Sequence, residues 1–110
     1  MATIFDDINV VTKQLDNALQ TYRTNGIERA ACEREYRKLK SQKILEYKQA
    51  GYPVTLIIDI VRGLDDVAEK AFERDVAESI YNANKEAINV KKIELKHLHN
   101  IYEMEWSQSK

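Results

Sequence analysis

The stretch that decides the fold lies at the centre of the chain and reads Gly51-Tyr52-Pro53-Val54-Thr55-Leu56-Ile57-Ile58-Asp59-Ile60-Val61-Arg62-Gly63. It contains the only proline and two of the three glycines of the 110-residue sequence, so the strongest helix breakers are concentrated in one place. Thr55 can cap the start of a short helix there, and Gly63 can end it in the left-handed conformation. The β-branched run also permits a strand, but no other segment would pair with it. We therefore expect a turn that carries a short helix at about residues 55–62.

The segments on either side of this turn are almost free of breakers and carry helical patterns. Before the turn, apolar or small residues recur at spacings of three and four, at Ile4, Ile8, Val11, Leu15, Ala18, Leu19, Tyr22, Cys32, Tyr36, Leu39 and Tyr47. This pattern predicts a helix over about residues 4–50, in which Asn25-Gly26 leaves a kink or short break open. After the turn, Asp65 or Asp66 can cap a second long helix, which is expected to run to about Trp106.

The second long helix carries two neighbouring apolar stripes. One contains Tyr81, Ile88, Leu95, Leu98, Tyr102 and Trp106, and the other contains Phe72, Val76, Ile80, Ala83, Ala87, Val90 and Ile101. Together they are wider than the seam of a two-stranded coiled coil requires, so one hairpin cannot cover both. The sequence therefore predicts a homo-oligomer, a dimeric or higher helical bundle, or binding to a helical protein partner.

Composition narrows the fold class to all-α. The chain is 44% hydrophobic and 32% charged, which is too apolar for a disordered tail, and it has too few Gly and Pro residues for the many turns of an all-β fold. We therefore expect an all-α protein: a long antiparallel helical hairpin, coiled-coil-like, that forms a single domain over residues 1–110.

Charge gives an independent indication of how the chain folds. The 17 basic and 18 acidic residues leave a net charge of −1, which argues against a generally basic nucleic-acid coat protein. The charges are segregated, because residues 23–48 hold eight basic and four acidic side chains, whereas residues 59–78 hold three basic and seven acidic ones. A fold at the central turn sets residue 39 roughly opposite residue 75, so the basic segment should run beside the acidic one.

Features of enzymes and of membrane proteins are missing from the sequence. It has no Gly-rich phosphate loop, nucleophile elbow or Ser/His/Asp series. Glu94-Leu95-Lys96-His97 has the Glu-x-x-His spacing of di-iron bundles, but such a site needs two of these motifs and the chain has one. We predict no enzyme activity and no catalytic, cofactor or metal residues, and we interpret the only cysteine, Cys32, as a packing residue. No apolar run reaches the ~18 residues needed to cross a bilayer and no signal peptide is apparent, so we expect a cytoplasmic protein without a membrane partner.

Two surfaces are candidates for binding. The first is apolar and combines the central turn with the end of the second long helix: Tyr52, Leu56, Ile57, Ile60, Val61, Tyr102 and Trp106. Alternatively, its central residues fold back to plug the end of the hairpin or complete a dimer. The second is basic, with Arg34, Arg37, Lys38 and Lys40 as candidate phosphate contacts, although pairing with the acidic segment is the favoured explanation of these charges.

Several of these residues also resemble a known group of proteins. The run Gly51-Tyr52-Pro53-Val54-Thr55-Leu56-Ile57, with Glu35-Tyr36-Arg37, Arg62-Gly63, Val67-Ala68-Glu69, Arg74-Asp75-Val76-Ala77, Tyr81 and Glu86-Ala87-Ile88, resembles small uncharacterised helical proteins encoded by phages and prophages of Gram-positive bacteria. The resemblance covers roughly residues 30–100. It implies a phage-derived protein of the bacterial cytoplasm, with no functional residue carried over.

Taken together, the sequence predicts a noncatalytic, phage-derived protein-interaction module that self-associates through its helices. One alternative is a nucleic-acid-binding accessory factor in phage replication or recombination, which would use the basic residues. Another is an inhibitor of a host enzyme or defence protein, which the sequence neither supports nor excludes.

Overall fold

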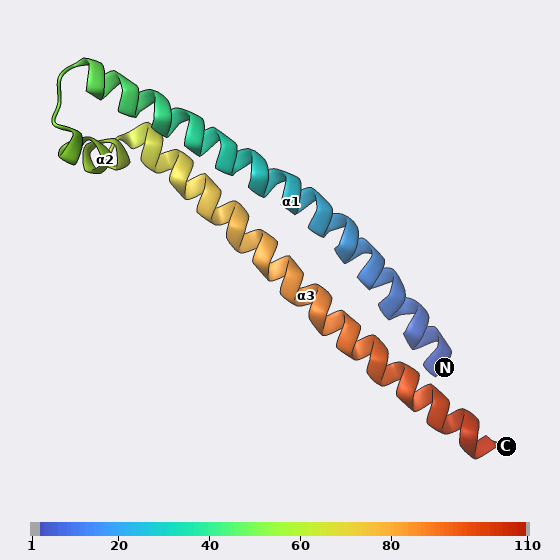
Figure 1. Cartoon of the computed structure of the whole chain (residues 1–110). Helices are drawn as coiled ribbons and strands as arrows, with labels where there is room; N and C mark the ends of the chain where they lie inside the picture. Colours follow the sequence, from blue (N-terminus) through green and yellow to red (C-terminus); the bar gives the residue numbers. More distant parts are fainter. Residues whose placement is uncertain (1–2, 110) are drawn as a thin grey trace. The chain divides into compact units, whose positions relative to one another are not determined.

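The computed structural model describes residues 3–109 of the chain. Three helices make up this part: α1 (Ile4–Gln49), α2 (Val54–Arg62) and α3 (Asp65–Ser109), and no strand occurs among the described residues. α1 and α3 are the arms of an antiparallel helical hairpin, and α2 lies at the turn between them (Figure 1). The predicted all-α hairpin with a short helix at its central turn is therefore confirmed.

Both ends of α1 carry a recognised capping motif. At its start, the backbone N–H of Thr3 donates to Asp6 Oδ2 and the backbone N–H of Asp6 donates to Thr3 Oγ1, each over 3.1 Å, which forms a reciprocal capping box. At its end, Gly51 adopts a left-handed φ of 85°. The N–H groups of Gly51 and Tyr52 then reach the carbonyl oxygens of Lys48 and Tyr47, as in a Schellman motif.

Both capping predictions for the short helix α2 are wrong. α2 begins at Val54 after Pro53, and its N-cap makes no side-chain hydrogen bond, so Thr55 lies inside the helix instead of capping it. Gly63 has φ −86° and ψ −7°, which is right-handed, and its N–H donates to the carbonyl oxygen of Ile60. The chain therefore needs no left-handed residue to pass from α2 into α3, and the left-handed glycine is Gly51.

Helix α1 continues without a break through Asn25 and Gly26. A glycine inside a helix costs about 1 kcal/mol relative to alanine, so Gly26 is the weakest position of α1. In the structure the ring of Tyr81 lies against this position, where a Cβ on Gly26 would be 3.4 Å from Tyr81 Cε2. Packing against α3 thus supports the helix at its weakest point.

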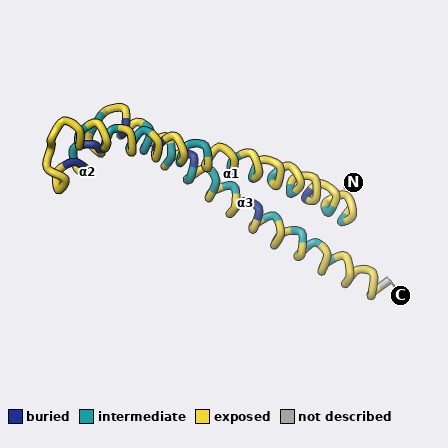
Figure 2. The backbone as a smooth tube through the Cα atoms, turned by 45° about the horizontal axis from the view of Figure 1, so that its top comes forward, coloured by how far each residue is buried: buried dark blue, intermediate teal, exposed yellow. Residues whose placement is uncertain are grey.

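The contacts of the chain fall into two compact units, and the single domain expected over residues 1–110 stays a prediction. Unit 1 combines the residues up to 24 with those from 82 onward, and unit 2 is Asn25–Tyr81. In unit 1, Val11 and Ile88 are buried, and Asn84 donates to the carbonyl oxygen of Ala18 over 3.4 Å. Each unit therefore pairs a stretch of α1 with a stretch of α3. In Figure 2 most of the surface of both helices is exposed and few residues are buried.

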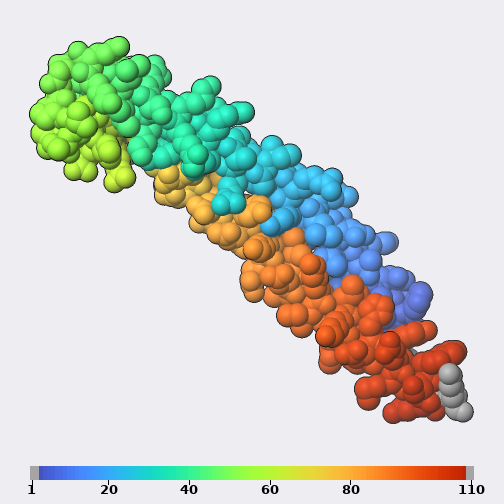
Figure 3. Space-filling model, viewed as in Figure 1, coloured from blue at the N-terminus to red at the C-terminus, as the bar shows by residue number. Residues whose placement is uncertain are grey.

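The main core lies in unit 2 and depends on α2. Its buried members are Tyr36, Ile57, Val61 and Val67, against which Leu39, Ile44, Tyr47, Leu64 and Ala71 pack. Ile57 and Val61 are 1% and 0% exposed, so one face of α2 is fully covered. Figure 3 shows the side chains of α2 and of the last turns of α1, both green, packed together into one surface.

The register of the hairpin in unit 2 differs from the predicted one. Arg29 pairs with Glu78 and Glu33 pairs with Arg74, so residue 39 lies level with about residue 68, two helical turns away from residue 75. The reason is that α2 packs against Ile44 and Tyr47 in the last turns of α1. α1 therefore extends past the start of α3, and the two arms are not symmetric about the turn.

Candidate functional site

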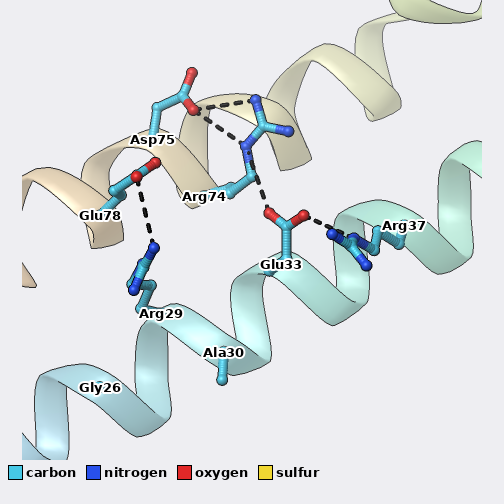
Figure 4. Close-up of a pocket in the computed structure, with 8 residues that line it drawn as sticks. All are labelled: Gly26, Arg29, Ala30, Glu33, Arg37, Arg74, Asp75 and Glu78. Carbon is cyan, nitrogen blue, oxygen red and sulfur yellow. Dashed lines mark hydrogen bonds and ion pairs between the residues drawn. The ribbon is translucent and has the colours of Figure 1, made fainter.

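A groove in unit 2 follows the ion pairs that join α1 to α3; we call it the charged groove (Figure 4). It is lined by Gly26, Arg29, Ala30, Glu33, Arg37, Arg74, Asp75 and Glu78. Arg29 Nη2 lies 3.7 Å from Glu78 Oε1, so the basic arm meets the acidic arm as expected. The second pair is reversed, because Glu33 Oε2 on α1 lies 3.8 Å from Arg74 Nε on α3. The charges of this groove largely neutralise one another.

Arg74 is held by more partners than any other side chain of the charged groove. Its Nη2 lies 3.1 Å from Asp75 Oδ1, and its guanidinium carbon lies 4.2 Å from the centroid of the Tyr36 ring. Partial burial works against the charged form, but hydrogen bonds to Asp75 and Tyr36 and the negative charge of Asp75 outweigh it and raise the pKa of Arg74. Arg74 is therefore a permanent, positioned cation.

A second, more positive depression opens beside the charged groove; we call it the basic hollow. It has a volume of about 550 Å³ and is lined by Glu33, Tyr36, Arg37 and Lys40 of α1, Arg62 of α2, and Val67, Ala71 and Arg74 of α3. Four of these residues are cations and one is a carboxylate, so all three helices contribute to a site with a local charge of +3.

Only two of the four predicted phosphate contacts line the basic hollow. Arg37 and Lys40 line the basic hollow, whereas Arg34 and Lys38 are exposed and do not line it. Sequence reasoning missed Arg62 and Arg74, because they lie on other helices and come near α1 only through packing. The spacing of three between Arg37 and Lys40 was the available signal, since it places both side chains on one face of a helix.

The second apolar stripe of α3 remains exposed in unit 2. Phe72, Val76 and Ile80 are 63%, 41% and 51% exposed, and with Glu28, Cys32, Glu73 and Ala77 they line a shallow depression of about 260 Å³, which we call the apolar groove. Spacings of four place the three large side chains on one face of the helix. In this unit, pairing of α1 with α3 buries Val67 and Ala77 of α3 and leaves these members of the second stripe exposed to solvent.

Some residues of the predicted apolar interface are buried in the core and others are exposed. Ile57 and Val61 belong to the core, so they do not offer a surface, and Ile60 is half-buried. Tyr52 and Leu56 are exposed, and the Tyr52 ring packs edge-on against Tyr47 at 4.9 Å. The alternative that the short helix plugs the end of the hairpin thus holds for one face of α2.

The remaining two interface candidates, Tyr102 and Trp106, lie in unit 1. Both are exposed, and the Tyr102 ring lies 6.5 Å from the ring of Phe5. Tyr102 and Trp106 line a shallow pocket together with Ile4 and Glu105. The pocket is open and has no cluster of polar groups directed into it from several elements.

Cys32 borders the apolar groove. Its thiol donates a hydrogen bond to Glu28 Oε1 over 3.5 Å. Burial raises the pKa of the Cys32 thiol, and the hydrogen bond and negative charge of Glu28 raise it further. At a given pH a smaller fraction of this thiol is therefore ionised than in a free cysteine, and the thiolate is the nucleophilic form.

The described part of the chain is a helical hairpin with a charged groove, a basic hollow and an apolar groove on its surface. Among residues 3–109, no three or more His, Cys, Asp or Glu side chains gather into a group that could bind a metal ion, and no helix in this range is long and apolar enough to cross a membrane. Comparison of the chain with models of protein families, with curated proteins and with solved structures found no significant match. The resemblance to phage proteins therefore stays a prediction.

Proposed function

We propose that this protein is a noncatalytic, phage-derived interaction module of the bacterial cytoplasm that self-associates through its helices. The observation that carries the proposal is the apolar groove, where Phe72, Val76 and Ile80 form an exposed row on α3. Large apolar side chains aligned at helical spacing are the pattern by which one helix packs against another. The row therefore supports a further helix as the occupant of this groove.

The amount of exposed surface supports the same conclusion. The chain exposes 8289 Å². A compact monomer of 12.8 kDa exposes about 6300 Å² by the usual scaling of surface with mass. The excess of about 2000 Å² per chain is more than the ~800 Å² that each partner buries in a standard protein–protein interface, so there is ample surface for one. Association of two copies would bring the exposed surface closer to that of an ordinary folded protein.

A second copy of this chain is the partner that the groove fits best. In a two-fold symmetric dimer each copy presents the same patch, so the apolar row of one α3 can pack against that of the other. The rim of the groove does not oppose this approach strongly, because the carboxylate of Glu73 is paired with Lys70 Nζ at 3.3 Å. A net charge of −1 also causes little repulsion between copies.

The test is the molar mass of the protein measured by size-exclusion chromatography with light scattering over a range of concentrations. We expect a dimer or larger assembly that is lost in Val76→Lys and Ile80→Lys. The matched control is Ile27→Lys, which changes a 68% exposed residue of α1 that does not line the groove and should leave the assembly intact. A folded wild-type protein that stays monomeric at every concentration would contradict the proposal.

A further inference from the structure

The basic hollow offers a function that is separate from self-association. It shares no lining residue with the apolar groove, so a ligand there would not occupy the proposed contact between copies. Its four cations come from three helices: Arg37 and Lys40 from α1, Arg62 from α2 and Arg74 from α3. Folding alone therefore gathers positive charges that are far apart along the chain.

These charges are only partly neutralised from within the hollow. Glu33 is the only carboxylate in its lining; it accepts a hydrogen bond from Arg37 Nε over 2.8 Å and lies 3.8 Å from Arg74 Nε. Arg74 also pairs with Asp75, which lies outside the hollow. Lys40 and Arg62 form no ion pair with any residue in the range 3–109. Two cations are thus left for a ligand.

The hollow is also organised before any ligand binds. Tyr36 forms part of its floor and is buried, with the Arg74 guanidinium carbon 4.2 Å and Lys40 Nζ 5.7 Å from its ring centroid. The ring positions both cations through its face. The N–H groups of Arg74 are already engaged by Asp75 and Glu33, so Lys40 is the positioned cation that remains for an anion. One of the two unpaired cations, Lys40, is therefore positioned before a ligand binds, which reduces the cost of ordering it.

We propose that the basic hollow binds phosphate groups. A phosphate carries several strong acceptor oxygens, so it can satisfy donors that converge from three helices, whereas a carboxylate has only two oxygens. Arg62, with all five N–H donors free of ion pairs in the described part of the chain, is the main new contact, and Lys40 is the second.

The source of the phosphate is a nucleic-acid backbone or a free phosphate compound, and the structure favours recognition without base reading. The Tyr36 ring is already covered by Arg74 and Lys40, so it is not free to stack on a base. Binding to a nucleic acid should therefore be independent of sequence and should weaken steeply with salt, as phosphate contacts do.

The experiment measures binding of the full-length protein to a fluorescent single-stranded oligonucleotide by anisotropy over a salt series, with inorganic phosphate and pyrophosphate as competitors. The test variant is Lys40→Gln with Arg62→Gln. The matched control is Lys38→Gln with Arg34→Gln, which also removes one lysine and one arginine charge, both from positions on α1 outside the hollow. Circular dichroism checks that both variants keep the helical fold.

We expect the test variant to bind at least about tenfold more weakly and to lower the salt slope by roughly 2, about one unit per lost contact, while the control changes little. Competition by millimolar phosphate or pyrophosphate, with weak oligonucleotide binding, would assign the hollow to a free phosphate compound and still support the proposal. The proposal is overturned if neither probe binds, or if the control variant loses as much affinity as the test variant.

Discussion

The guanidinium carbon of Arg74 lies 4.2 Å from the centroid of the Tyr36 ring, and this stack joins α3 to α1 in the core of unit 2. Tyr36 is buried and packs with Ile57 and Val61 of α2 on another side. The ring therefore belongs to the hydrophobic core and also supports a cation of the basic hollow. A substitution at this position should separate these two roles.

We predict that Tyr36→Ala destabilises the protein by about 3–5 kcal/mol, because it leaves a cavity beside α2. Tyr36→Phe keeps the ring under Arg74 and should cost less than about 1 kcal/mol. Urea unfolding followed by circular dichroism gives both values. Equal losses in the two variants would show that the hydroxyl, and not the ring, holds this part of the core.

The packing of α2 gives a second prediction. Ile57→Ala should cost about 2–5 kcal/mol, since Ile57 is almost fully buried against Tyr36 and Val67. Its neighbour Ile58 is 46% exposed, so Ile58→Ala serves as the control and should cost less than about 1 kcal/mol. Thermal unfolding compares the two variants. Similar melting temperatures for both would mean that α2 does not dock on α1 and α3 in solution.

Substitution by alanine should change the stability of the protein in opposite directions at Gly26, which lies inside α1, and at Gly51, which follows its C-terminus. Gly51 has a φ of 85°, so Gly51→Ala forces a strained backbone and should cost roughly 1–2 kcal/mol. At Gly26 the added methyl would lie in ordinary contact, 3.4 Å from Tyr81 Cε2. Gly26→Ala should therefore stabilise the protein by about 0.5–1 kcal/mol. Denaturant midpoints measure both effects, and stabilisation at Gly51 would contradict the turn geometry.

The environment of Cys32 predicts a pH dependence. Burial and Glu28 raise the pKa of the thiol, so at pH 8 a smaller fraction is thiolate than in a free cysteine. Alkylation by iodoacetamide should therefore be slower than in the urea-unfolded protein, and its pH profile should be shifted to higher pH. Glu28→Gln should move the profile back toward lower pH. A profile that does not change in this variant would remove Glu28 as a cause.

The helices themselves were predictable from sequence to within a few residues. The predicted helix over residues 4–50 is Ile4–Gln49, the short helix over 55–62 is Val54–Arg62, and the helix from 65 to 106 continues to Ser109. This agreement follows from the distribution of Pro and Gly, because breakers gathered at one point leave long helices on both sides. The outcome at Asn25-Gly26 depended on contact with Tyr81, which no local pattern shows.

The register and the composition of the site were not predictable in the same way. The position of residue 39 depends on how α2 packs against Ile44 and Tyr47, and the sequence does not specify the direction in which a nine-residue helix folds back. The basic hollow depends on this packing too, since it brings Arg62 and Arg74 beside Arg37 and Lys40. Counting charges along one segment selected Arg34 and Lys38, whose side chains lie outside the hollow.

The division of contacts into two units gives each half of the hairpin its own natural reporter. The only tryptophan, Trp106, belongs to unit 1, and the only cysteine, Cys32, belongs to unit 2. Indole emission and a thiol-linked dye can therefore follow the two regions in one unmutated chain during the same denaturant titration. Coincident curves would make the hairpin one cooperative folding block, whereas separate midpoints would identify the half that opens first.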